Sequence, residues 1–157
     1  MAGSVKQIPE GYHTVNTYLT LRDASEAITF YKKAFGAEEV FRLDGPQGKV
    51  AHAELRLGDS TIMLSDEMPG GKCRSPQSLG STTITLFLYV PDVDRTFNQA
   101  VAAGAQVVMP VADMFWGDRF GQVTDPFGHS WGIGTHKEDL SHEELQKRGR
   151  IAMAQMG

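Results

Sequence analysis

The sequence contains a single cysteine, Cys73, among its 157 residues. One cysteine cannot form a disulfide within the chain, so the fold is not expected to depend on such a bond. Chains with so little cysteine are typical of a reducing compartment. The first residues, MAGSVKQIPEGYH, also lack the charged start and apolar stretch of a secretory signal peptide. We therefore expect a cytoplasmic protein.

Long apolar runs and an excess of positive charge are also missing. No run approaches the ~20 apolar residues that a membrane-spanning helix needs. The formal net charge is -4, whereas nucleic acids and anionic membranes attract basic surfaces. There is no phosphate-binding glycine loop of the Walker type, no Cys-x-x-Cys pair and no nucleophile elbow. The expected partners are a small organic molecule and a second copy of the chain, rather than nucleic acid or membrane.

What the sequence does contain is an internal repeat. TYLTLRDASEAITFYKKAFGAEEVF and FLYVPDVDRTFNQAVAAGAQVVMP both show an apolar strand, an aspartate, a helical pattern, Gly-Ala and another strand. Asp23 and Asp92 are 69 positions apart, and Gly36 and Gly104 are 68 positions apart. Two repeats are too few for a solenoid, so the pattern favours a pair of modules.

Each half of the chain predicts one strand, one helix and three further strands. In the first half the strand is expected over 14–21 and the helix from Asp23 to Gly36, which are good capping residues. In the second half they are expected over 83–90 and 93–103. The three further strands are EEVFRLD, KVAHAELRL and STIMLSD in the first half, and AQVVMPV, DRFGQVT and HSWGIGTH in the second.

The fold class is therefore predicted to be α+β, with two repeated βαβββ modules. They are expected over 10–67 and 82–136, joined by the Pro/Gly/Ser-rich linker 68–81. The tail 137–157 is predicted to be helical, because Ser141 and Glu144 have the spacing of a capping box.

At this point the sequence resembles a known family. The segments AITFYKKAFGAEEVFRL, AHAELRLGDSTIMLSDE and GDRFGQVTDPFGHSWGIGTHKEDL look like the vicinal oxygen chelate superfamily, which includes glyoxalases, bleomycin-resistance proteins and extradiol dioxygenases. Within it they look most like the PhnB-like branch. The resemblance implies that each module curves a mixed sheet around a cavity, with the helix on the outer face. It also implies that metal-dependent members bind one divalent ion with His or Glu from four strand positions.

Those four positions land on residues of the wrong type in this chain. They correspond to Asn16, Met63, Thr85 and Gly132, none of which is His, Glu or Asp. An amide, a thioether, a hydroxyl and a bare backbone are poor ligands for a hard or borderline cation. We therefore expect no metal cofactor, and instead assign these four residues to ligand binding.

Glycines and aromatic residues suggest where a ligand would lie. Gly132 and Gly134 share a strand face with Ser130, which leaves room either for a bulky ligand or for a bulge in a curved sheet. Tyr18 and Phe87 face the inferred cavity by strand alternation. Together with the other three positions, these residues form the predicted ligand-binding set.

The aromatic loop MFWGDRFG supplies two further candidates. Trp116 could stack on a planar ligand, and Arg119 could hold a carboxylate or phosphate through paired hydrogen bonds. The alternative is that Arg119 pairs with Asp118 or Asp125 and holds the turn.

His52 and Glu54 are the candidate catalytic residues. They lie two apart in VAHAEL and so share one strand face, where an imidazole beside a carboxylate could act as an acid–base pair. They could instead form half of a relocated metal site, completed by His129 or His136. The plainest alternative is a hydrogen-bonded pair on a sheet surface.

Three functions follow from these observations. The leading hypothesis is a metal-free protein that binds a small organic molecule in an aromatic cavity, for sequestration or for catalysis without metal. One alternative is a metal-dependent lyase, isomerase or dioxygenase with the relocated site and a divalent metal ion. Another is a dimeric interaction module without ligand. A homodimer is expected in each case, because Ile151, Met153 and Met156 give the tail an apolar end that needs burial.

Overall fold

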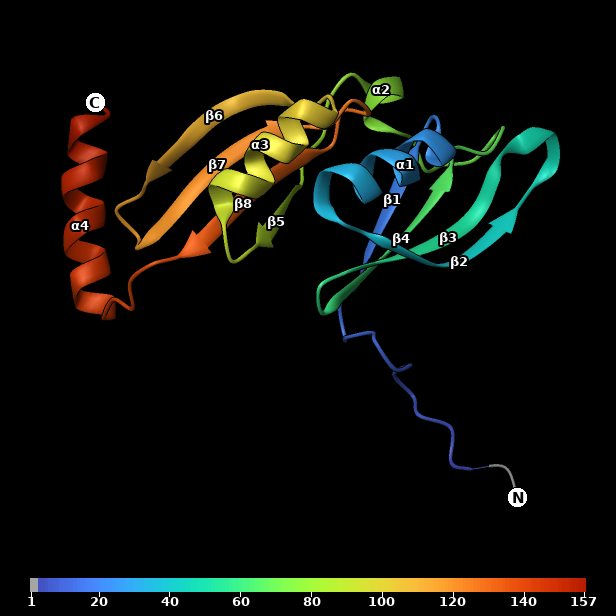
Figure 1. Cartoon of the computed structure of the whole chain (residues 1–157), viewed down its shortest axis with the longest axis horizontal. Coiled ribbons are helices and arrows are strands. Elements are labelled where there is room, and N and C mark those ends of the chain that lie inside the picture. Colours follow the sequence, from blue (N-terminus) through green and yellow to red (C-terminus); the bar gives the residue numbers. More distant parts are fainter. Residues whose placement is uncertain (1–2) are drawn as a thin grey trace. The chain divides into compact units, whose positions relative to one another are not determined.

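The computed structural model describes residues 3–157 and divides into two compact units, which meet in sequence between Thr82 and Thr83 (Figure 1). Each unit holds one four-stranded mixed sheet and repeats the order strand, helix, three strands. The predicted α+β class with two βαβββ modules is therefore confirmed.

The first unit has the strand order β1-β4-β3-β2. β1 runs parallel to β4, and the other neighbours are antiparallel. Its elements are β1 (Thr17–Leu21), α1 (Ala24–Phe35), β2 (Glu38–Asp44), the 3-10 turn η1 (Pro46–Gly48), β3 (Val50–Leu57), β4 (Ser60–Asp66) and α2 (Pro76–Leu79).

The second unit repeats this topology with the order β5-β8-β7-β6, and β5 is parallel to β8. Its elements are β5 (Thr85–Tyr89), α3 (Val93–Ala103), β6 (Gln106–Asp113), β7 (Asp118–Thr124), β8 (Ser130–His136) and α4 (His142–Gln155). The predicted helix over 93–103 is confirmed, whereas both first strands begin later than predicted. Val15 and Ile84 consequently precede their strands and are 86% and 69% exposed.

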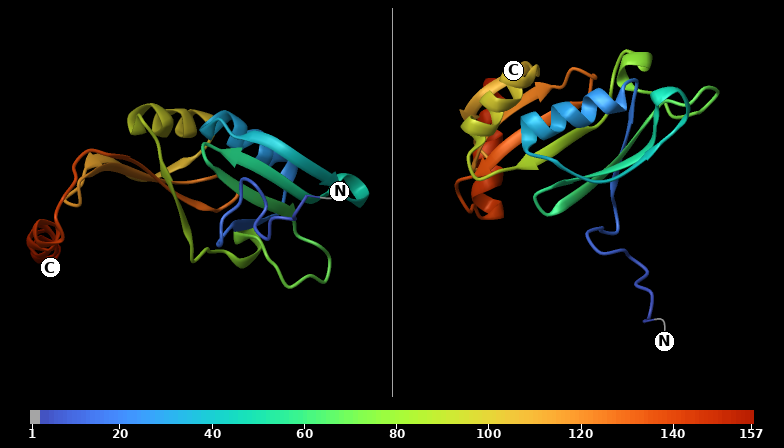
Figure 2. Two further views of the ribbon diagram at one scale, coloured as in Figure 1. Left: turned by 90° about the horizontal axis from the view of Figure 1, so that it is seen from below. Right: turned by 45° about the vertical axis from the view of Figure 1, so that its right-hand side comes forward.

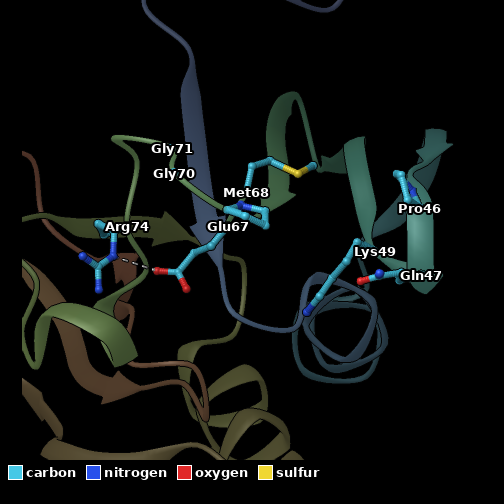
Figure 3. Close-up of a pocket in the computed structure, with 9 residues that line it drawn as sticks. Pro46, Gln47, Lys49, Glu67, Met68, Gly70, Gly71 and Arg74 are labelled. Carbon is cyan, nitrogen blue, oxygen red and sulfur yellow. Dashed lines mark ion pairs between the residues drawn. The ribbon is translucent and has the colours of Figure 1, made fainter.

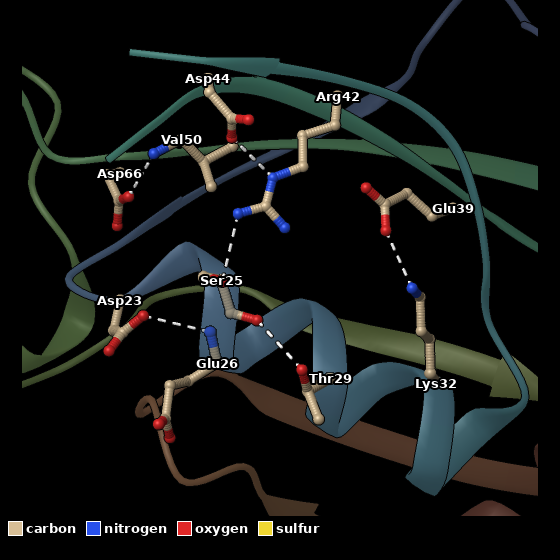
Figure 4. A network of polar contacts seen from close by, with 10 residues as sticks. All are labelled: Asp23, Ser25, Glu26, Thr29, Lys32, Glu39, Arg42, Asp44, Val50 and Asp66. Atoms are coloured by element: carbon tan, nitrogen blue, oxygen red, sulfur yellow. Dashed lines mark hydrogen bonds and ion pairs between the residues drawn. The ribbon is translucent and has the colours of Figure 1, made fainter. Parts of the chain in front are cut away.

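Matching caps explain why a helix forms at the same place in each repeat. The Asp23 carboxylate accepts the backbone N–H of Glu26 at 3.1 Å, as Figure 4 shows. The Asp92 carboxylate accepts the backbone N–H of Arg95 at the same distance. These bonds satisfy N–H groups that the first helical turn leaves without partners. Gly36 ends α1 in the left-handed conformation, as predicted.

Each sheet buries one face beneath its own helix, as Figure 2 shows for α1 and α3. In the first unit this face includes Leu19, Leu55 and Leu64, all at most 5% exposed. We call the opposite face of each sheet its open face. Because side chains alternate along a strand, the residues directly before and after each of these leucines lie on the open face.

Two buried carboxylates, those of Asp66 and Asp125, hold nearby backbone segments in place by accepting their N–H groups. Asp66 accepts the N–H groups of Ala24 and Val50, both at 2.7 Å, and so ties α1 and β3 to the end of β4. Asp125 accepts the N–H groups of Phe127 and His129 and the indole N–H of Trp131. The Asp-Pro-Phe-Gly turn before β8 is therefore held by its first residue.

The segment predicted as a linker, 68–81, contains structure of its own. Ser75 is fully buried and caps the short helix α2, which belongs to the first unit. The carboxylate of Glu67 accepts the Ser75 N–H at 2.6 Å and the Ser78 hydroxyl at 2.8 Å. A Pro/Gly/Ser-rich composition did not reveal these contacts.

The tail forms α4, capped by Ser141, whose hydroxyl accepts the Glu144 N–H at 3.1 Å. None of its residues is buried, and Ile151 and Met153 are 54% and 55% exposed. Of the helices within residues 3–157, none is long and apolar enough to cross a membrane.

Candidate functional site

The open face of the first sheet carries a row of side chains from all four strands. Tyr18 on β1 is paired with Met63 on β4, Met63 with Glu54 on β3, and Glu54 with Phe41 on β2. Paired residues point to the same face of a sheet. The sequence repeat and strand register thus bring together three predicted site residues and one, Phe41, that was not predicted.

His52 joins this row and completes a hydrogen-bonded chain. The Tyr18 hydroxyl lies 2.9 Å from His52 Nδ1, and His52 Nε2 lies 3.2 Å from Glu54 Oε1. The Tyr18 and His52 ring centroids are 5.5 Å apart, and the Phe41 ring lies 6.3 Å from the imidazole on another side. Phenol, imidazole and carboxylate therefore follow one another on one accessible face.

Tyr12 approaches the carboxylate end of this chain from the segment before β1. Its hydroxyl oxygen is buried and makes no hydrogen bond of normal geometry among the described residues. Burial, with a smaller contribution from the nearby Glu54 carboxylate, raises the pKa of Tyr12 to about 12. Tyr12 therefore remains a protonated phenol at neutral pH.

The open face of the second sheet is filled differently. Gly132 and Gly134 have no side chains, and the rings of Phe120 and Phe87 occupy the space above them. These two rings stack with centroids 5.3 Å apart. The rings of Phe120 and Phe87 therefore take the space that an added side chain at either glycine would occupy.

Beside these rings, hydroxyl and amide groups bind one another. The Thr85 and Ser130 hydroxyls are 2.9 Å apart, and the Gln122 side-chain amide donates to Ser130 at 2.8 Å. Thr85 and Ser130, which were both predicted to bind a ligand, lie on the open face. Their hydroxyl groups already have hydrogen-bond partners within the second unit.

A buried carboxylate, Asp118, lies at the centre of a polar cluster in the second unit. It accepts hydrogen bonds from the Tyr89 hydroxyl at 2.7 Å and the Trp116 indole at 3.0 Å, and it lies 2.8 Å from His136 Nδ1. The second His136 nitrogen lies 2.8 Å from Asp139. Trp116, predicted to stack on a ligand, thus has its indole N–H committed to Asp118.

The charges of this cluster shift one another's pKa values. Burial alone would raise the pKa of Asp118, but the hydrogen bonds from His136, Tyr89 and Trp116 outweigh it and lower that pKa. Asp118, and next Asp139, raise the pKa of His136. The hydrogen bond to Asp118, followed by burial, raises the pKa of Tyr89.

Arg119 lies on the other side of the second sheet and binds carboxylates there. Its guanidinium contacts Asp94 of α3 at 2.8 and 2.9 Å and Asp113 of β6 at 3.2 Å. The partners predicted as an alternative, Asp118 and Asp125, are therefore wrong. The structure does not bring Arg119 to the open face, where the other predicted ligand-binding residues of this sheet lie.

The four positions at which metal-dependent relatives would hold an ion do not fit one. Asn16 precedes β1, and its amide exchanges hydrogen bonds with the His13 backbone. Met63 offers only a thioether, and the Thr85 hydroxyl is already hydrogen-bonded to Ser130. Gly132 has no side chain that could bind an ion. Zn²⁺ and Mn²⁺ are usually held by carboxylate, imidazole or thiolate donors, and these positions offer at most one amide oxygen, which already accepts the His13 backbone N–H.

The relocated metal site draws on residues of both units. His52 and Glu54 lie on β3, whereas His129 belongs to the turn before β8 and His136 to the cluster around Asp118. Within residues 3–157 no three His, Cys, Asp or Glu side chains gather as a possible metal-binding group.

A hollow of about 640 Å³ lies in the first unit, between the turn η1 and the chain after β4 (Figure 3). Lys49 borders it on one side, and the ion pair of Arg74 with Glu67, at 3.6 Å, borders it on the other. The Ser75 backbone N–H, followed by the Ser78 hydroxyl, lowers the pKa of Glu67. None of the residues predicted for the site lines this hollow.

Comparisons with known proteins agree with the fold. A model of the Glyoxalase/Bleomycin resistance protein/Dioxygenase superfamily matches residues 12–133, and the chain belongs to this superfamily. An uncharacterised protein of Mycobacterium bovis is 47% identical over 135 residues, which cover 84% of this chain and 89% of that protein.

Solved structures show the same architecture. TioX from Micromonospora sp. ML1 is 29% identical, with a TM-score of 0.62, and the match covers 78% of this chain and 98% of TioX. A PhnB protein from Bacillus cereus has a TM-score of 0.63 at 22% identity, over 78% of this chain and 99% of that one. At this identity the likeness to PhnB shows the fold alone.

Besides Phe41, sequence reasoning missed two members of these clusters, Tyr12 and Asp118. Tyr12 lies in a segment without strand or helix periodicity, so nothing in the pattern placed it beside Glu54. Asp118 was considered only as a partner of Arg119, although alternation from Phe120 places it on the open face with Tyr89 and His136.

Proposed function

We propose that this protein binds a small organic molecule on the open face of its first sheet, without a metal ion. The observation that carries the proposal is the chain Tyr18–His52–Glu54, which presents phenol, imidazole and carboxylate beside the apolar groups of Met63 and Phe41. Binding sites combine such an apolar surface with a few convergent polar groups.

The second sheet supports the proposal by contrast. Its corresponding open face is occupied by Phe87 and Phe120, and its polar groups bind one another. This favours a supporting or interaction role for the second open face, and we therefore expect the ligand on the first.

A ligand screen by thermal shift tests the proposal. A molecule at 100 times its dissociation constant stabilises the folded state by ~2.7 kcal/mol, which is readily detected. We expect hits among small organic molecules with and without EDTA. Met63→Trp, which places a bulky ring on the open face of the first sheet, should abolish the shift, whereas Thr85→Trp on the second sheet is the matched control.

Two results would overturn this function. The first is one tightly held divalent metal per chain in protein purified without chelator, which would favour the metal-dependent lyase, isomerase or dioxygenase. The second is a ligand shift that survives Met63→Trp and is lost with EDTA.

A further inference from the structure

The hollow between η1 and the chain after β4 has the features of a second binding site. Its volume of about 640 Å³ lies within the range of small-molecule sites. All of its lining residues belong to the first unit, and none of them is a member of the chain Tyr18–His52–Glu54. A molecule bound here would therefore use groups that the proposed function does not use.

Both rims of the hollow are turns held by backbone hydrogen bonds. On one rim the Gly45 N–H donates to the Lys49 carbonyl at 2.7 Å, and the Lys49 N–H donates to the Pro46 carbonyl at 3.2 Å. On the other rim the Gly71 N–H donates to the Met68 carbonyl at 2.9 Å. The groups that border the hollow are therefore held in place before any molecule binds, which lowers the entropy that binding costs.

The charged residues that line the hollow, Lys49, Glu67 and Arg74, leave one net positive charge. The Glu67 carboxylate already accepts two hydrogen bonds within the fold and forms an ion pair with Arg74. Lys49 forms no ion pair among residues 3–157, and its ammonium group donates only to the Arg22 carbonyl, at 3.3 Å. An ammonium group has three donors, so two are left for an anion that enters the hollow.

Gln47 lies on the same rim as Lys49, across the hollow from Glu67 and Arg74 (Figure 3). With φ 60° and ψ 32°, it is the one non-glycine residue between positions 3 and 157 in the left-handed conformation, which glycine adopts without strain. Its side-chain amide makes no hydrogen bond within that part of the chain. Backbone strain of this kind gathers at ligand-binding sites, and here it keeps a second polar group available beside the ammonium group.

We propose that this hollow binds a small organic carboxylate, with its anionic group on the Lys49 ammonium and the Gln47 amide and its apolar part against Met68. Met68 is 41% exposed, and Pro46 and Pro69 line the hollow with it. A carboxylate matches the single net charge of the lining, whereas a phosphate group carries about 1.5 to 2 negative charges at neutral pH.

Titration of the full chain with 3-phenylpropionate, followed by nitrogen–proton correlation NMR spectra, tests the inference. This probe joins one carboxylate to an apolar ring. We expect the amide signals of Gly70 and Gly71, which line the hollow, to move until the site is saturated, while those of Gly132 and Gly134 on β8 stay fixed. The neutral amide of the same shape, 3-phenylpropionamide, should bind about fivefold more weakly, as expected for the loss of an exposed ion pair.

Variants of the rim separate a specific contact from a general charge effect. Lys49→Gln should weaken the binding of 3-phenylpropionate about fivefold, for the same reason as the neutral probe. Lys72→Gln is the matched control, because it removes the same charge from a residue that does not line the hollow, and it should leave the affinity unchanged. Gln47→Gly should weaken binding about threefold through the lost hydrogen bond. It should not lower the unfolding temperature, because glycine relieves the strained backbone.

Several results would overturn the inference. They are equal binding of 3-phenylpropionamide and the carboxylate, tighter binding of phenyl phosphate than of the carboxylate, and equal losses for Lys49→Gln and Lys72→Gln. Movement of the Met63 signal in place of the Gly70 signal would put the probe on the open face and overturn it too, as would no movement up to ~50 mM, where even very weak binding is visible. The ligand screen for the proposed function can succeed or fail independently, since Met63 does not line this hollow.

Discussion

At the scale of single residues, Asp66 is a carboxylate used for structure rather than chemistry. It is 3% exposed and accepts two backbone N–H groups at 2.7 Å. Asp66→Ala leaves both groups buried without partners, at a cost of roughly 3 kcal/mol in the free energy of unfolding. Urea denaturation measures this loss, and Asp59→Ala in the exposed turn between β3 and β4 is the control, with little expected change.

Gly132 is required by the rings that cover it. A Cβ atom there would lie 2.8 Å from Phe120 Cε2, so Gly132→Ala overpacks the face and should cost about 1–3 kcal/mol. Gly149→Ala is the matched comparison, because its Cβ would lie 3.5 Å from the Phe115 ring, an ordinary contact. That change should raise helicity in α4, since alanine is a better helix former than glycine. Equal urea midpoints for the two variants would contradict this account.

His136 and Asp118 make the stability of the second unit depend on pH. The raised pKa of His136 means that its contribution is complete below about 6.5, the unfolded value, and is lost as pH rises through the folded pKa. The lowered pKa of Asp118 means that its contribution is lost as pH falls through its own folded value. We expect His136→Gln to reduce the unfolding free energy more at pH 5 than at pH 9.

A double-mutant cycle checks that prediction. In an Asp118→Asn background the additional effect of His136→Gln should be smaller at pH 5, because the paired charge is already gone. A pH-independent effect of His136→Gln in both backgrounds would show that the contact is not electrostatic.

At the same scale, the sequence indicated which residues share a face but not which of them touch. Strand alternation correctly placed His52 and Glu54 on the same face of the first sheet. It also correctly placed Tyr18 and Leu19 on opposite faces. The contact between Tyr18 and His52 depends on the pairing of β1 with β4 and of β4 with β3, which no local pattern encodes. The pairing of Arg119 with Asp94 was missed for the same reason, since it joins a strand to a helix 25 residues earlier.

At the scale of elements, the repeat makes a quantitative expectation possible. Asp23 and Asp92 cap α1 and α3 through bonds of equal length. Replacing either by Ala should lower stability by about 1 kcal/mol. Serine, which keeps a capping oxygen, should restore most of the loss, and thermal unfolding measures both effects. An aspartate that could be replaced by alanine without loss would not be acting as a cap.

Helices and sheet strands were largely predictable because both rest on local signals. Capping residues and helical spacing fixed α1 and α3, and alternation fixed most strands. The helix α2 was not predicted, because four residues within a Pro/Gly/Ser-rich stretch give no periodicity. Its position depends on Glu67, which binds Ser75 and Ser78 through contacts formed only in the fold.

At the scale of the whole molecule, exposed apolar groups favour self-association. Ile151 and Met153 on α4 are more than half exposed, and Met156 is 78% exposed. We expect a homodimer, which light scattering would report as about 34 kDa against 17.2 kDa for one chain. Deleting residues 138–157 should weaken it.

Point changes give a sharper test of this assembly. The pair Ile151→Glu and Met153→Glu leaves the helix in place while charging two of its exposed apolar positions, and it should shift the protein toward monomer. A full-length chain that remains monomeric up to ~100 µM, where even weak association becomes visible, would rule the dimer out.

The pairing of first and last strands within each sheet also bears on how the chain acquires its structure. β1 pairs with β4 between residues 45 positions apart, such as Thr17 and Ile62, and β5 pairs with β8 over the same separation, such as Thr85 and Ser130. Neither sheet is complete until its last strand is available. The chain must therefore lose the entropy of closing a long loop before the first and last strands gain their hydrogen bonds. During synthesis the first sheet can close once Asp66 has left the ribosome, well before β8 exists. The first unit, which carries Tyr18 and His52, is therefore expected to fold ahead of the second.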